Sequence, residues 1–107
     1  MKKCEAPAHL SKEARQWWDK ITEEYAIDDD AGRLLLQTAL EAFDRMRSCQ
    51  KQIGEDGETI RDRFEQHKPH PLLATERDSR AQMLAALKAL NLDLEPLRDR
   101  PGRPGGV

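Results

Sequence analysis

The sequence predicts an all-α protein: a long antiparallel helical hairpin plus a third helix, with a short irregular or β-hairpin insertion. Apolar residues recur at helical spacing in separate stretches of the chain, and a segment rich in turn signals divides the last two of them. The chain has 107 residues, of which 37% are hydrophobic and 36% charged. A single domain with a thin core is therefore expected. Assembly into a ring-like homo-oligomer would complete the burial of apolar surface.

The first helix is predicted over residues 12–26, and residues 1–10 before it are interpreted as a flexible N-terminal arm. Ser11 suits the N-cap, because its hydroxyl can accept a hydrogen bond from a free backbone N–H of the first turn. The apolar positions of this helix share one side; they are Ala14, Trp17, Trp18, Ile21 and Tyr25.

The second helix, predicted over residues 29–53, carries the strongest amphipathic pattern. Asp28, Asp29 and Asp30 supply a cap and negative charge at its start. Its apolar stripe comprises Leu35, Ala39, Ala42, Phe43, Met46, Cys49 and Ile53, widened by Leu36 and Leu40. Gly54 follows as a natural terminator. Together the first two helices are expected to form the antiparallel hairpin.

The segment between the second and third helices has no helical stripe. Asp56-Gly57 is a turn signal. Two short extended pieces around Thr59-Ile60 and Phe64 would make a small β-hairpin.

The third helix is predicted from about Pro71 to Asn91. Its continuous face comprises Leu73, Arg77, Arg80, Leu84, Leu87 and Leu90, with Met83 beside it. Leu92, Leu94 and Leu97 are expected to pack back on the bundle, which gives a helical domain over residues 11–97. Residues 98–107 are rich in Pro and Gly and are predicted to be a disordered tail.

No motif for catalysis or for nucleotide binding is present. His67 and His70 have H-x2-H spacing, but the second close pair that a structural zinc site needs is missing. The alternative is a loop-to-helix joint, because Pro71 suits the first turn of a helix. We therefore expect no enzyme, no cofactor and no metal. With neither a signal peptide nor an apolar run of about 20 residues, the chain is expected to be cytoplasmic, without a membrane contact.

The adjacent tryptophans indicate a second interface. Neighbouring residues on a helix point about 100° apart, so Trp17 and Trp18 cannot both bury in one thin seam. One is expected in the core, and the other against the third helix or another subunit. The alternative, that both belong to the core of a single chain, stays open.

The order of several short segments resembles one family. "APAHLSKEARQWWDKI", "LLLQTALEAFDRM", "GEDGETI", "HKPHPLL" and "LKALNLDLEP" follow one another over roughly residues 7–97. This order resembles the small terminase subunits of tailed bacteriophages and prophages, which show P-x-x-L-x-x-x-A-x-x-x-W near the start and His-Pro before the last helix. Asn91 stands where the family often has Gly, and still suits the end of a helix.

The resemblance implies a non-catalytic DNA-packaging protein in the bacterial host cell. Its partners would be double-stranded viral DNA, the large terminase subunit and further copies of itself. The candidate DNA-binding residues are Lys12, Arg15, Arg45, Arg47, Lys51, Arg98, Arg100 and Arg103. The candidate oligomer-interface residues are Trp17, Trp18, Leu36, Leu40 and Met83. A small helical regulatory adaptor that binds protein but not DNA is the alternative.

Overall fold

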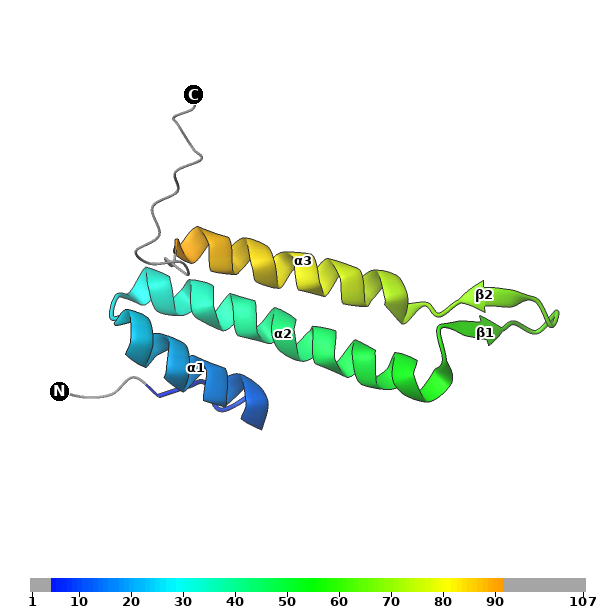
Figure 1. Cartoon of the computed structure of the whole chain (residues 1–107), viewed down its shortest axis with the longest axis horizontal. Coiled ribbons are helices and arrows are strands. Elements are labelled where there is room, and N and C mark those ends of the chain that lie inside the picture. The colour runs from blue at the N-terminus through cyan, green and yellow to red at the C-terminus, as the bar shows by residue number, and fades with distance from the viewer. Residues whose placement is uncertain (1–4, 92–107) are drawn as a thin grey trace, which may run out of the picture.

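The computed structural model describes residues 5–91 and is mostly helical, with a small two-stranded antiparallel sheet. The elements in chain order are α1 (Lys12–Tyr25), α2 (Asp30–Asp56), β1 (Thr59–Arg61), β2 (His67–Pro69) and α3 (Leu72–Leu90). Figure 1 shows α2 and α3 side by side and antiparallel, with α1 along the N-terminal part of α2. The predicted all-α class, with its small β insertion, is confirmed.

The start of α1 is fixed both to itself and to α2. The Ser11 hydroxyl accepts a hydrogen bond from the backbone N–H of Ala14 at 3.0 Å, as predicted for an N-cap. The same residue donates to the carboxylate of Asp44, from its N–H at 2.8 Å and from its hydroxyl at 2.5 Å. Ala26 ends the helix in the left-handed conformation, with φ 52°. The short connection to α2 then ends at Asp29, whose side chain caps α2 by accepting from Gly32.

The core lies where α1 and α3 pack on α2. Its buried cluster consists of Leu10, Ala14, Trp18, Leu36, Leu40, Phe43 and Met46. Partly buried apolar side chains from α3 and from the α1–α2 connection pack against this cluster, among them Ile27, Met83 and Leu90. The stripe predicted for α2 therefore forms the central part of the core.

The predicted end of the second helix at Gly54 is wrong. Helix α2 continues to Asp56 and ends at Gly57, whose φ of 90° suits glycine and whose N–H donates to the carbonyl of Ile53 at 2.6 Å. A glycine inside a helix costs only about 1 kcal/mol relative to alanine. A side-chain hydrogen bond stabilises the last turn, in which Gln52 donates to the carboxylate of Asp56 at 2.9 Å.

Helices α1 and α2 form the expected antiparallel pair, although α1 covers only part of α2 and α3 pairs with α2 over a greater length. The buried face of α3 contains Glu76, Ser79 and Ala86, whereas the predicted face residues Arg77, Arg80 and Leu84 are exposed. The remaining predicted positions, Leu73, Met83, Leu87 and Leu90, are half-buried, so the prediction of this face is correct only in part.

Polar partners explain why this face of α3 can be buried. Gln50 of α2 donates to one carboxylate oxygen of Glu76 at 2.9 Å, and Arg80 donates to the other. A buried carboxylate is tolerated when its hydrogen bonds are made. The helix begins after Pro71 and ends at Asn91, which takes the left-handed conformation expected of it. Leu92, Leu94, Leu97 and the predicted tail lie outside the described residues.

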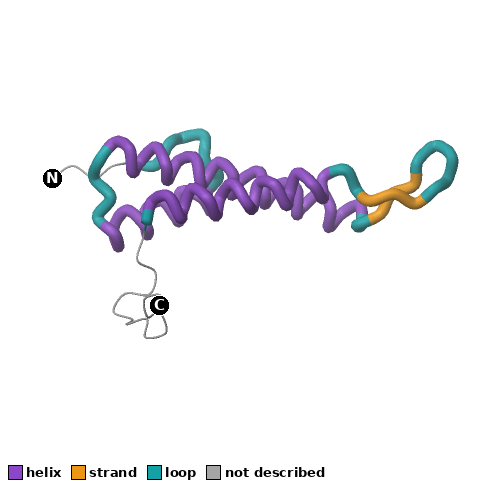
Figure 2. The backbone as a smooth tube through the Cα atoms, turned by 90° about the horizontal axis from the view of Figure 1, so that it is seen from above, coloured by secondary structure: helices purple, strands orange, loops and turns teal. Residues whose placement is uncertain are grey.

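The insertion is a β-hairpin that extends beyond the ends of α2 and α3 (Figure 2). Its register pairs Thr59 with Pro69, Ile60 with Lys68 and Arg61 with His67. Phe64 lies in the turn between the strands and not in a strand, which corrects the predicted second piece. His67-Lys68-Pro69 forms that strand instead.

Candidate functional site

An open apolar groove lies between α1 and α3, with α2 as its floor. It has a volume of about 360 Å³ and is lined by Trp17, Ile21, Ala39, Leu40, Phe43, Met46, Arg47, Met83 and Leu87. We call it the α1–α3 groove. Trp17 is 44% exposed, and the ammonium group of Lys20 lies 5.2 Å from the centre of its ring. A groove of this kind is suited to binding an apolar group, since its walls are side chains that water solvates poorly.

The two tryptophans differ as the helix geometry requires. Trp18 is 2% exposed and belongs to the core, while Trp17 lines the groove. Of the other predicted interface residues, Leu36 and Leu40 are buried within the single chain, whereas Met83 is half-buried on the groove wall. Because Trp18 and Leu36 are buried within one chain, another copy cannot contact them. Leu40 can be contacted only at the floor of the groove.

Arg45 and Arg47 are both engaged within the chain, on different sides of α2. The Arg45 guanidinium donates to the side-chain oxygen of Gln82 in α3 at 2.8 Å. The Nε of Arg47 lies 3.4 Å from a carboxylate oxygen of Glu13, and its guanidinium carbon lies 5.0 Å from the centre of the Phe43 ring. Residues two positions apart on a helix point in directions about 200° apart, so these arginines do not share one surface.

Lys12, Arg15 and Lys51 are exposed and form no ion pair with the described part of the chain. Lys12 and Arg15 lie on the same side of α1, three residues apart. Lys51 follows Arg47 by one turn of α2, and the contact of Arg47 with Glu13 brings that turn beside the start of α1. Lys12 and Arg15 therefore present two free cations in the first turn of α1, and Lys51 presents a third on α2, one turn beyond the contact with Glu13. The candidates Arg98, Arg100 and Arg103 lie outside the described residues.

His70 joins α2, the β-hairpin and α3. Its side chain is buried, and its Nε2 lies 2.9 Å from a carboxylate oxygen of Asp56. The Nδ1 accepts a hydrogen bond from the N–H of Leu72 at 3.0 Å. Because Nδ1 is the acceptor, the ring proton lies on Nε2 and is donated to Asp56. Hydrogen bonds from Gln52 and then from His70 hold the pKa of Asp56 below its ordinary value.

His70 thus has a structural role, and the other two histidines lie elsewhere in the chain. His67 is exposed in β2, and His9 contacts the carboxylate of Glu41 at 2.7 Å. Within residues 5–91, no group of three or more His, Cys, Asp or Glu side chains is arranged to hold a metal ion.

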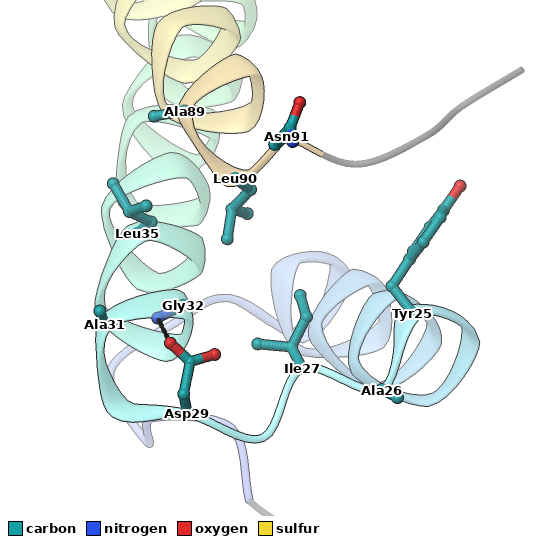
Figure 3. Close-up of a pocket in the computed structure, with 10 residues that line it drawn as sticks. All are labelled: Tyr25, Ala26, Ile27, Asp29, Ala31, Gly32, Leu35, Ala89, Leu90 and Asn91. Carbon is teal, nitrogen blue, oxygen red and sulfur yellow. Dashed lines mark hydrogen bonds between the residues drawn. The ribbon is translucent and has the colours of Figure 1, made fainter.

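A second pocket, of about 390 Å³, lies where the α1–α2 connection meets the end of α3 (Figure 3). Ile27 and Leu90 point toward it from different elements, and Leu35 of α2 adds to its lining. Asp29 is the only carboxylate that lines it, and its side chain already caps α2 through Gly32 at 3.1 Å. The lining contains no nucleophile paired with a base, so the pocket offers no catalytic arrangement.

These features define a small helical domain whose accessible surfaces suit binding. The chain belongs to the phage terminase small subunit family, whose sequence model matches residues 14–96. Small terminase subunits act in phage DNA packaging and are generally the non-catalytic component of the terminase. Neither the curated proteins nor the solved structures contained a match to this chain. Among residues 5–91, no helix is both long enough and apolar enough to cross a membrane.

The residues that carried the resemblance in the sequence are structural. Leu10, Ala14 and Trp18 are buried together in the core, and His70 caps α3. The exposure of Phe64 was not predicted from the sequence. An apolar residue between the charged Arg63 and Glu65 in a turn segment does indicate an exposed position.

Proposed function

We propose that this protein is the small subunit of a phage terminase, which binds the packaging region of double-stranded viral DNA and recruits and regulates the large ATPase–nuclease subunit. The family match over most of the chain carries this proposal. The site of action is the cytoplasm of the host cell.

Exposed cations of α1 and α2 are the proposed DNA contacts. Lys12, Arg15 and Lys51 are free to pair with phosphates, which position a duplex without reading its sequence. Arg45 and Arg47 would first have to give up Gln82 and Glu13. The net charge of the chain is −2, so a single copy binds weakly. Several copies in one assembly present the same cations repeatedly, which multiplies a weak contact.

The proposed assembly is a ring-like homo-oligomer. The α1–α3 groove leaves apolar side chains, including Trp17 and Met83, open to solvent. Covering the groove with another copy would remove this surface from water and complete a thin core. Tryptophan is also enriched among the residues that dominate binding at protein interfaces.

A DNA titration tests the proposal. The full chain is titrated against fluorescent duplex DNA that carries the viral packaging region, at two salt concentrations. The triple variant Lys12→Ala/Arg15→Ala/Lys51→Ala should bind more weakly and lose about 0.9 units of salt slope for each phosphate contact removed. The charge-matched control Arg61→Ala/Arg77→Ala/Lys88→Ala changes exposed cations elsewhere and should bind like the wild type.

Two outcomes would contradict the DNA role. One is no duplex binding by the wild type at low salt. The other is an equal loss in the two triple variants, which would reflect net charge alone. If the wild type fails to bind DNA but captures the purified large terminase subunit, the protein is a regulatory adaptor that binds only protein.

A further inference from the structure

Phe64 is an aromatic side chain displayed at the tip of the β-hairpin. It is 70% exposed, the largest exposed fraction among the large hydrophobic side chains of residues 5–91. No other described part of the chain covers it. Leaving a phenyl ring in water is unfavourable, which raises the question of what covers it.

The turn that presents Phe64 is rigidly organised. One carboxylate oxygen of Asp62 accepts hydrogen bonds from the N–H of Phe64 at 2.8 Å and of Gln66 at 2.9 Å. Its other oxygen lies 3.2 Å from the ammonium group of Lys68. Backbone hydrogen bonds between Asp62 and both Glu65 and Gln66 close the loop. An aromatic side chain held in place before binding loses little freedom on binding, and such anchors dominate interfaces.

The α1–α3 groove has the size and character to receive a phenyl ring. Its volume is about 360 Å³, and an apolar cavity of about 150 Å³ is already sufficient to bind benzene. Trp17 and Phe43 offer aromatic faces, and Met83 offers a polarisable thioether for contact with a ring.

Charge favours the contact at one point. Arg63, next to Phe64, has its guanidinium 5.4 Å from the Phe64 ring and forms no ion pair within the described residues. On α1, Glu24 follows Ile21 by one turn, is exposed and forms no ion pair within the described residues, so it is the carboxylate that Arg63 of another copy could meet. Glu13 is already paired with Arg47, which also lines the groove.

A chain cannot insert Phe64 into its own groove. The floor of the groove is formed by α2 up to Arg47. From there α2 continues for nine more residues to Asp56, about 14 Å at 1.5 Å per residue. The hairpin then extends further in the same direction, away from α1 (Figure 1). The groove and the hairpin tip lie at opposite parts of the molecule, so the ring that fills the groove must come from another molecule.

We propose that Phe64 of one copy inserts into the α1–α3 groove of the next copy. This contact joins two different surfaces, so each chain has one anchor and one groove to offer. Such a head-to-tail contact produces a closed ring or an open filament, and not a symmetric dimer. The inference rests on the proposed function for the existence of an assembly, and it specifies the contact that builds it.

Mixing two complementary variants tests the contact. Phe64→Ser removes the anchor and keeps the groove, while Trp17→Glu blocks the groove and keeps the anchor. Light scattering of the full chain at micromolar concentration should show a multi-copy wild type. Each variant alone should have the mass of one chain, 12.3 kDa. An equimolar mixture should form a pair of one copy of each variant and nothing larger, because only one anchor–groove contact is possible.

The matched controls change exposed apolar residues outside the groove. Leu34→Ser and Leu84→Glu, at positions 64% and 55% exposed, should assemble like the wild type. Circular dichroism of every variant confirms that the helices persist, so that a loss of assembly is not a loss of fold.

Three results would overturn the proposal: a monomeric wild type, a Phe64→Ser or Trp17→Glu variant that assembles normally, or a mixture that stays monomeric. These results are separable from the DNA role. A wild type that assembles by this contact but binds no duplex overturns the packaging function alone. A wild type that binds duplex while Phe64→Ser still assembles overturns the contact alone.

Discussion

The Nδ1 of His70 accepts a hydrogen bond from the backbone N–H of Leu72 at 3.0 Å, and this contact caps the first turn of α3. The N-cap position itself is Pro71, whose side chain makes no capping hydrogen bond. The cap is therefore supplied from the preceding residue. Since the other ring nitrogen contacts Asp56 at the end of α2, one side chain holds both ends of the β-hairpin.

We predict that His70→Ala lowers the free energy of unfolding by about 1–3 kcal/mol, because a buried N–H loses its partner. Hydrogen exchange should also accelerate in residues 58–70. In His70→Asn the amide oxygen can replace Nδ1 as the acceptor. This control should therefore keep most of the capping interaction but lose the hydrogen bond to Asp56. Equal destabilisation by the two substitutions would contradict the capping role.

The two glycines near the end of α2 should respond to alanine in opposite directions. Gly54 lies inside the helix with no atom within 4 Å of an added Cβ, so Gly54→Ala should stabilise by about 0.5–1 kcal/mol. Gly57 has φ 90°, so Gly57→Ala should cost about 1–3 kcal/mol. Chemical denaturation measures both. Destabilisation by Gly54→Ala would instead indicate that the helix ends there.

The adjacent tryptophans should have separate effects. Trp18→Ala empties a core position and should cost about 3–5 kcal/mol, measured by denaturation of a dilute sample. Trp17→Ala should cost far less stability and should instead reduce the mass of the assembly in light scattering. Equal losses of stability with an unchanged mass would contradict this assignment.

The Glu76 carboxylate should make the pairing of α2 and α3 sensitive to acid. Hydrogen bonds from Arg80 and then from Gln50 hold the pKa of Glu76 below its ordinary value. The ionised carboxylate therefore contributes fully to the free energy of unfolding at pH values above the unfolded-state pKa of about 4.3. This contribution is lost as the pH falls from that value toward the lower pKa of the folded state.

Glu76→Gln should accordingly lower Tm by several degrees near neutral pH. The difference from wild type should shrink from neutral pH to an acid pH below the unfolded-state pKa of about 4.3, where the unfolded chain takes up the proton first. The control Asp78→Asn alters a carboxylate on the same helix whose pair with Arg77 is exposed, and it should have little effect at either pH. A difference that does not change with pH would contradict the role of the ionised Glu76.

Removing residues 98–107 should weaken DNA binding without disturbing the fold or the assembly. The deletion removes Arg98, Arg100 and Arg103 against a single carboxylate, Asp99, so the salt slope of binding should fall. Helicity and the mass of the assembly should match those of the full chain. Loss of assembly in the truncated protein would refute this prediction.

Local patterns explain most of what the sequence predicted correctly. The Ser11 cap, the start of α2 near Asp29 and the left-handed Asn91 depend on residues within one turn of each helix end. The apolar stripe of α2 was also readable, because helical periodicity alone decides which side chains share a face. The order of such short segments was sufficient to indicate the terminase small subunit family.

The tertiary structure decided what depends on residues far apart in the chain. Glu76 can face inward only because Gln50, 26 residues earlier, supplies a partner, and no local pattern contains that contact. The choice of Trp18 for the core and Trp17 for the groove depends on where α2 and α3 lie around α1. The exposure of Phe64 depends in the same way on a hairpin that no other element of residues 5–91 covers. The sequence by itself therefore determined the helices and all of their ends but the C-terminal end of α2, while packing between distant segments determined which faces are buried and which remain open for a partner.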